Sequence, residues 1–340
     1  MLSKNCLILS LLPKQPVKSG MQNTVFYLNK FLHQKNNTKF LNILSKNNVD
    51  PILNLKHSKI IEKKIIKTIE TFKPRLIFVN TSKLLYLYKK ILLNKNKLYK
   101  IILVNHDLYF FRKKFFWQVG VKDKTRLSNI SEINTIKKVD HIIDYSFEEQ
   151  KYLLSKKISK SKFIFTRTPI NFLNNSRIKK KYYDFLYIGS YWKQNDLSLK
   201  WILRNIIEKS ENKKLLVLGI KKPKRRIKNV YFKNYKRKYF KNCKIGLGIV
   251  KFGSGRKVKI FEMLGSAIPV VSNTDLKDYG LKNKKHYIFI KKEREYLKRI
   301  NSLHGNKKLI KSLSKNSYRW SKQNSYYKFA FKKLKILLKA

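Results

Sequence analysis

Short apolar runs alternate with longer amphipathic stretches along the first half of the chain. The runs, rich in Ile, Leu, Val and Phe, cover residues 6–12, 40–44, 75–79, 100–104, 141–145 and 162–165. Residues 23–33 and 58–71 instead repeat their apolar positions at helical spacing. Because doubly buried strands of a parallel sheet form short continuous apolar runs, this order predicts βαβ units with helices on both faces of a sheet.

The second half repeats this order after a polar break at residues 174–181. Strands are predicted over residues 185–188, 215–218, 230–232, 244–249, 268–271 and 287–290, and helices over 197–210, 258–265, 294–302 and most of 309–339. A chain of 340 residues is long enough for two domains. We therefore expect an α/β protein with a first domain over 1–172, a linker over 173–182, a second domain over 183–322 and a terminal helix over 323–340.

The charge of the chain is strongly positive, since 80 Lys and Arg against 19 Asp and Glu give +61. Lys, Asn and Ile all have A/T-rich codons, so a biased genome would raise them together without any partner. The functional alternative is attraction to polyanions, either nucleic acid or an anionic membrane surface. The basic residues are spread along the chain rather than gathered in an arm, so we expect weak membrane association and not nucleic acid as the partner.

Several kinds of site are excluded by the sequence. Two cysteines, Cys6 and Cys243, cannot form a disulfide framework or a multi-thiolate zinc site. Walker-type, GxSxG and HExxH motifs are absent, and so is an Asp-x-Asp pair that would hold a cation against a diphosphate. No metal or cofactor is therefore expected. The first apolar run is followed by Pro13 and is too short for a signal peptide or a membrane span, so a cytoplasmic protein is expected.

The most informative stretch is 252–272, FGSGRKVKIFEMLGSAIPVVS. A predicted strand runs into a loop with Gly253, Ser254 and Gly255, and a helix follows. Glycines at this place let backbone N–H groups approach a phosphate closely. Lys257 and Lys259 stand in the first turn of that helix, where cations are unfavourable unless an anion compensates them.

Glu262 lies seven residues after Gly255, about two turns into the same helix. A carboxylate there can accept two hydrogen bonds from a vicinal diol such as a ribose. Taken by itself, Glu262 is more readily explained as a solvent-facing residue of an ordinary helix.

The segment 253–272 resembles the nucleotide-sugar signature of group 1 (family 4-like) glycosyltransferases of the GT-B fold. Residues 185–195 (FLYIGSYWKQN), 229–232 (NVYF) and 240–246 (FKNCKIG) are similar to other segments of that family's second domain. Residues 16–21, 104–107 and 139–146 match its first domain more loosely. The resemblance implies two Rossmann-like parallel-sheet domains facing each other across a cleft, with the terminal helix packed back on the first domain.

The resemblance also implies roles for individual residues. Glu262 would bind the ribose hydroxyls of a nucleoside-diphosphate sugar, which is the donor substrate. The groups that would hold its diphosphate are Gly253, Gly255, Lys257 and Lys259, with Ser19 and Gly20 approaching from the first domain. His106 would lie on the acceptor side near the reacting carbon, as the candidate catalytic residue. Such enzymes retain the anomeric configuration without a metal, and stabilise charge on the leaving diphosphate.

Three departures from the family pattern concern the donor site. One is Ala267, where Gly is common before the Pro-Val-Val strand; the other two bear on the identity of the donor sugar and on neutralisation of the phosphates. Ser254 replaces the family's first Glu, eight residues before Glu262, which contacts the donor sugar. The usual Arg–Lys pair after the first strand of the second domain is missing, and after Gly189 only Lys193 is a substitute.

We therefore expect a glycosyltransferase that transfers a sugar to a glycan or lipid-linked acceptor in bacterial envelope polysaccharide synthesis, working at the inner face of the cytoplasmic membrane. One alternative is a catalytically inert GT-B-like protein that binds glycans or acts as a scaffold, which the change at Ser254 favours. Another is a polyanion-binding protein.

Overall fold

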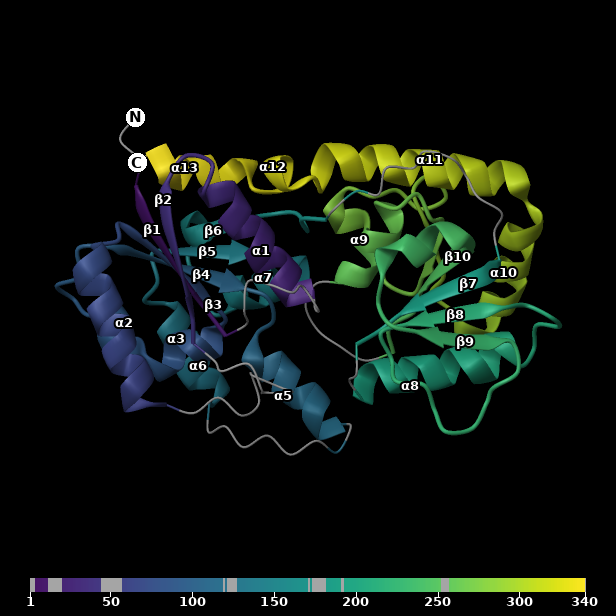
Figure 1. The fold of residues 1–340 in the computed structure, drawn as a ribbon, viewed down its shortest axis with the longest axis horizontal. Coiled ribbons are helices and arrows are strands. Elements are labelled where there is room, and N and C mark those ends of the chain that lie inside the picture. The colour runs from purple at the N-terminus through teal and green to yellow at the C-terminus, as the bar shows by residue number, and fades with distance from the viewer. Residues whose placement is uncertain are drawn as a thin grey trace. The chain divides into compact units, whose positions relative to one another are not determined.

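The fold consists of two compact units (Figure 1). The computed structural model describes residues 4–11, 20–43, 57–118, 120, 127–170, 172, 182–190, 193–251 and 257–339. The first unit takes in the chain up to Pro169 and again from Ala330, and the second unit the chain between Ile170 and Phe329. The domain boundaries expected from the sequence stay a prediction.

A six-stranded parallel sheet forms the centre of the first unit, in the order β2-β1-β3-β4-β5-β6. Its strands are β1 (Asn5–Ser10), β2 (Asn37–Asn42), β3 (Leu76–Asn80), β4 (Lys100–Asn105), β5 (His141–Asp144) and β6 (Phe163–Phe165). The middle strands are buried on both faces, which is why their sequences are continuously apolar. All six strands lie within two or three residues of the predicted runs.

Helices follow almost every strand of the first unit. They are α1 (Gly20–Leu32), α2 (Lys59–Phe72), α3 (Ser82–Leu87), α4 (Lys89–Leu92), α5 (Tyr109–Gln118), α6 (Asn129–Ile136) and α7 (Phe147–Ser155). The sequence pattern predicts only α1 and α2. The chain returns to this unit with α13 (Lys335–Lys339), and the ring of Phe331 lies 5.6 Å from that of Phe31 in α1.

The second unit contains another six-stranded parallel sheet, in the order β12-β11-β10-β7-β8-β9. Its strands are β7 (Tyr183–Ile188), β8 (Leu215–Leu218), β9 (Val230–Lys233), β10 (Cys243–Gly248), β11 (Val270–Ser272) and β12 (Ile288–Phe289). Its helices are α8 (Lys193–Ile202), which continues as a π-helical turn (Leu203–Ile207), α9 (Val258–Leu264), α10 (Tyr296–Gly305), α11 (Lys307–Asn324) and α12 (Tyr327–Ala330). The predicted α/β class with two parallel sheets is thus confirmed.

The terminal stretch predicted as mostly helical over 309–339 is broken after Asn324. α11 ends there, and the chain continues as short helical pieces. Within the described ranges, no helix is both long and apolar enough to cross a membrane.

Candidate functional site

The ammonium of Lys259 lies at the carboxyl edge of the second sheet, where ligands of open α/β sheets usually bind. Lys259 is in the first turn of α9, and its side chain is partly buried. Its Nζ lies 3.3 Å from the hydroxyl oxygen of Tyr187 and 3.3 Å from Oδ1 of Asn195, and 4.6 Å from the centre of the Tyr187 ring. Among the described residues, this cation contacts two neutral oxygens and an aromatic face.

The surroundings of Lys259 disfavour its charge. Burial, and then repulsion from the neighbouring Lys257, lower the pKa of Lys259 to about 7. Burial also raises the pKa of Tyr187, so its phenol stays protonated and donates to the carbonyl oxygen of Asn195 over 3.1 Å. A bound anion next to Lys259 would reverse this effect and favour the ammonium form.

Close backbone packing shapes the same edge of the sheet. The N–H of Gly189, directly after β7, donates to the carbonyl oxygen of Leu218 over 3.0 Å. Gly219, directly after β8, has a φ of +84°, and a Cβ there would lie 2.2 Å from the oxygen of Gly189. Only glycine fits such a position. Asn195 then closes the turn after β7, because its Nδ2 donates to the carbonyl oxygen of Ser190 over 3.0 Å.

Two of the predicted donor-binding residues lie on α9 itself. Lys257 directly precedes the helix, and Glu262 follows Lys259 by three residues, so Glu262 and Lys259 are on neighbouring positions of one helix face. Glu262 is partly buried. The structure thus brings Lys259 and Glu262 together on one short helix that Lys257 directly precedes.

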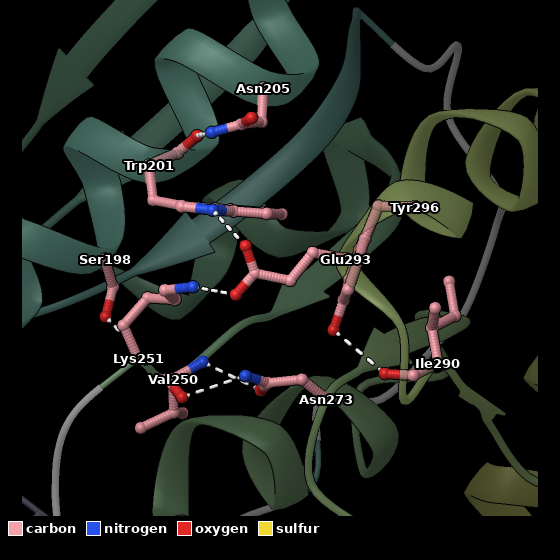
Figure 2. A network of polar contacts seen from close by, with 9 residues as sticks. All are labelled: Ser198, Trp201, Asn205, Val250, Lys251, Asn273, Ile290, Glu293 and Tyr296. Atoms are coloured by element: carbon pink, nitrogen blue, oxygen red, sulfur yellow. Dashed lines mark hydrogen bonds and ion pairs between the residues drawn. The ribbon is translucent and has the colours of Figure 1, made fainter.

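A polar network fixes the chain directly after β10, as Figure 2 shows. The Lys251 ammonium forms an ion pair with Glu293 and lies 5.0 Å from the centre of the Trp201 ring. The indole N–H of Trp201 donates to the same carboxylate over 3.0 Å. The backbone of Val250 exchanges two hydrogen bonds of 2.9 Å with the side chain of Asn273. These contacts anchor the last described residue before the predicted glycine loop.

The remaining predicted donor-binding residues are only partly described. Ser19, Gly253, Ser254 and Gly255 lie outside the described residues. Gly20 is the first residue of α1, and Lys193 is the first residue of α8, in the turn that Asn195 closes.

His106, the predicted catalytic residue, directly follows β4 at the carboxyl edge of the first sheet. It is 6% exposed, and its ring stacks on that of Tyr145 with 5.6 Å between the centres. Two buried carboxylates, Glu132 and Glu149, accept hydrogen bonds from the backbone that follows His106. His106 therefore stands on a segment that its surroundings hold firmly.

Sequence reasoning missed Glu132 and Glu149, as well as Tyr187 and Asn195. A signal for Glu149 exists, because Ser146 and Glu149 have the spacing of a capping box at the start of a helix. In the structure the Ser146 hydroxyl does accept from the Glu149 N–H, over 3.4 Å, but the Glu149 carboxylate binds elsewhere. Among the residues that the structure describes, no three His, Cys, Asp or Glu side chains gather as a set of metal ligands.

Solved structures with the same overall fold include sucrose-phosphate synthase from Thermosynechococcus elongatus, at 12% sequence identity and a TM-score of 0.73, covering 99% of this chain and 98% of that chain. HepE from Anabaena, in complex with UDP and glucose, matches at 11% identity and a TM-score of 0.71, with 99% and 100% covered. A glycosyltransferase from Rickettsia africae matches at 12% identity and a TM-score of 0.64, with 99% and 98% covered. No protein-family model and no curated protein sequence matches the chain.

At these levels of identity the similarities define the fold. The chain has the GT-B fold of two Rossmann-like units, and this part of the sequence resemblance is confirmed.

Proposed function

We propose that the protein is a glycosyltransferase whose second unit binds a nucleoside-diphosphate sugar at the carboxyl edge of its sheet. The observation that carries this proposal is Lys259, a partly buried cation whose partners Tyr187 and Asn195 are neutral. The diphosphate of a donor would supply an anionic partner, which Lys259 does not have among the described residues. The fold supports the same activity, because HepE, one of the structural neighbours, was solved with UDP and glucose.

In this proposal Lys257 and the residues of α9 each bind a different part of the donor. Lys257 and Lys259 neutralise the charge that grows on the diphosphate as the glycosidic bond to it breaks, and cations placed in advance stabilise such a transition state strongly. Glu262 accepts hydrogen bonds from the ribose hydroxyls. His106 acts on the acceptor side. Transfer proceeds with retention and without a metal, onto a glycan or lipid-linked acceptor of the bacterial envelope.

The replacement of Glu262 by Ala tests the donor site. UDP and a panel of nucleotide sugars are first ranked by how far they raise the melting temperature, since a ligand of the native state stabilises it. Calorimetry with UDP then compares Glu262→Ala with Glu208→Ala, an exposed glutamate of the same unit. We expect UDP binding to be lost only in Glu262→Ala. Unchanged affinity would remove Glu262 from the site, and no release of nucleoside diphosphate from any donor would favour an inert protein.

We also propose that the protein associates with anionic membranes through residues 219–242. This segment contains eleven Lys and Arg and no Asp or Glu. Five of its cations line a cavity of about 590 Å³ beside β9: Lys222, Arg225, Arg226, Lys228 and Lys233. Basic residues near an anionic surface each contribute about 1 kcal/mol.

Flotation with phosphatidylglycerol vesicles tests this surface. The triple change of Lys222, Arg225 and Arg226 to Glu is compared with the same change at Lys307, Lys308 and Lys311, three exposed residues of α11. We expect only the first variant to lose binding. Equal loss in both would mean that net charge alone attracts the protein to the membrane, and tighter binding to single-stranded DNA than to vesicles would favour the polyanion alternative.

A further inference from the structure

Three consecutive backbone N–H groups after His106 donate to carboxylates that come from two other helices. The N–H of Leu108 donates to Oε1 of Glu149 in α7 over 3.2 Å. The N–H groups of Tyr109 and Phe110 donate to the two oxygens of Glu132 in α6, over 2.7 and 2.8 Å. The first turn of α5 is thus held by side chains distant in sequence.

The same two carboxylates also accept hydrogen bonds from the end of β4 and from the start of α3. The second oxygen of Glu149 accepts from the side-chain amide of Asn105, the last residue of β4, over 3.1 Å. Glu132 also accepts from the hydroxyl of Ser82, the first residue of α3. Glu149 therefore holds the chain on both sides of His106, at Asn105 and at Leu108.

These carboxylates are not required by their own helices. The hydroxyls of Ser128 and Ser146 already accept from the first turns of α6 and α7. Glu132 and Glu149 are each 1% exposed, and a buried carboxylate loses much of its hydration energy. Burial raises the pKa of Glu132, although its three hydrogen bonds oppose this. The free-energy cost of this burial is offset by the hydrogen bonds that the carboxylates accept from the His106 segment.

The backbone beside this network is itself strained. Thr81, between β3 and α3, has a φ of 98°, which is rare for a β-branched residue. Strain of this kind persists where the surroundings hold it, and it is commonest near functional sites. Glu132 binds the next residue, Ser82, and so connects the turns after β3 and β4.

We propose that Glu132 and Glu149 are positioning residues that fix the His106 segment for the transfer reaction. In this proposal they touch no substrate and act through their contacts with the Ser82 and Asn105 side chains and with the backbone of residues 108–110. The claim that this positioning supports catalysis rests on the proposed function. The claim that the two carboxylates hold residues 105–110 in place can be tested without measuring any activity.

Hydrogen exchange tests the structural part. Glu149→Gln and Glu132→Gln keep the size of each side chain but replace one accepting oxygen by an NH2 group, which cannot accept from Asn105 or from a backbone N–H. We expect the amide of Leu108 to exchange at least tenfold faster in Glu149→Gln, and the amides of Tyr109 and Phe110 at least tenfold faster in Glu132→Gln. Asp140→Asn is the matched control, because Asp140 accepts from the N–H of Ile101 at the opposite end of β4. Unchanged exchange at 108–110 in both Gln variants would overturn the proposal.

Double-mutant kinetics test the catalytic part. With the donor found by thermal shift, Glu149→Gln should lower kcat about tenfold and leave KM for the donor within twofold. In a His106→Ala background the same change should have less than a twofold effect, because its influence passes through His106. If the fold-losses in kcat of the two single variants multiply in the double variant, Glu149 acts independently of His106, and the positioning role is overturned.

The two proposals fail in different ways. If the wild-type chain releases no nucleoside diphosphate, the glycosyltransferase proposal fails, while the exchange rates still decide whether the carboxylates hold residues 105–110. If the wild type is active and the exchange rates do not change, the positioning role fails alone. Thermal unfolding of each variant confirms that it is folded, and Glu149→Gln suffices if Glu132→Gln does not fold.

Discussion

The two sheets are alike at their amino edges and different at their carboxyl edges. At the amino edge of the first sheet, Asp140 accepts from the N–H of Ile101 over 2.7 Å and forms an ion pair with Lys97. In the second sheet, Asp184 accepts from the N–H of Lys214 over 2.9 Å and forms an ion pair with Lys244. Each unit thus uses an aspartate to join neighbouring strands.

The carboxyl edges differ in which charged groups contact the chain directly after the strands. Buried carboxylates of Glu132 and Glu149 hold the first edge and bind the chain's own N–H groups. The second edge carries Lys257 and Lys259, and the sequence between 212 and 261 contains no acidic residue at all. The difference teaches that the N–H groups after His106 are already bound by the protein's own carboxylates, whereas Lys259 has neutral partners and is suited to an anion from outside.

The largest expected effect is on the backbone of the second edge. Gly219→Ala should lower the free energy of unfolding by about 3 kcal/mol, because its φ is positive and the new Cβ would meet the oxygen of Gly189. Urea unfolding measures the change. Gly305→Ala is the control, since a Cβ there meets nothing within 4 Å. Equal stability of the two variants would contradict the close approach of β7 and β8.

The second largest expected effect is a loss of UDP affinity when the Lys259 ammonium is removed. Lys259→Met keeps the length of the side chain and removes a charge-assisted hydrogen bond to phosphate, which is worth about 2.5 kcal/mol, or roughly 70-fold in Kd. Calorimetry compares it with Lys307→Met on the exposed start of α11. A loss of equal size in both variants would show that the second edge has no special affinity for anions.

The fold was predictable because each buried strand is a short, continuous run of apolar residues in the sequence. LLVL at 215–218 coincides with β8, and the other strands shift by one to three residues at their ends. There polar residues such as the half-buried Asn5 and the exposed Lys233 continue the ladder. The helices α5, α6 and α7 were missed because their periodicity is weaker. In α6, for example, the buried face includes Glu132 and Thr135, which no apolar pattern reveals.

The candidate site was predictable only where a local motif exists. Lys257, Lys259 and Glu262 are close in sequence, so a seven-residue helix suffices to bring them together. Tyr187 and Asn195 approach Lys259 from β7 and α8, and Glu149 approaches Asn105 across more than forty residues of chain. Such contacts depend on the register of whole elements, and the sequence gives no local sign of them.

Acid should weaken the amino edge of the second sheet. Burial alone would raise the pKa of Asp184, but hydrogen bonds from the Lys214 backbone and from neighbouring side chains lower it to about 2. Since the ordinary pKa is 3.8, the carboxylate contributes about 2 kcal/mol above pH 4, and this is lost as the pH falls towards 2.

Asp184→Asn should therefore be less stable than the wild type at pH 7 and nearly equal to it at pH 2. Thermal unfolding at both pH values measures the difference, with Asp140→Asn as the counterpart in the first unit. If the difference in stability between wild type and Asp184→Asn is the same at pH 7 and pH 2, the pKa of Asp184 is not lowered by its contacts and the prediction is wrong.

The smallest expected effect concerns the network of Figure 2. The Glu293 side chain is 58% exposed, so Glu293→Ala should lower the free energy of unfolding by only about 0.5 kcal/mol, mainly through the ion pair with Lys251. Glu295→Ala, which breaks the exposed pair with Arg299, is the matched control. A loss above about 2 kcal/mol for Glu293 would mean that this network is a main support of the second unit.

The most direct test of an anion site on the second sheet is the number of protons taken up when UDP binds. Calorimetry at pH 8, in two buffers with different ionisation enthalpies, gives this number. Because the pKa of Lys259 is about 7 without ligand and a diphosphate would raise it, we predict an uptake approaching one proton per UDP, absent in Lys259→Met. Binding with no proton uptake, or no binding of UDP, would contradict the account.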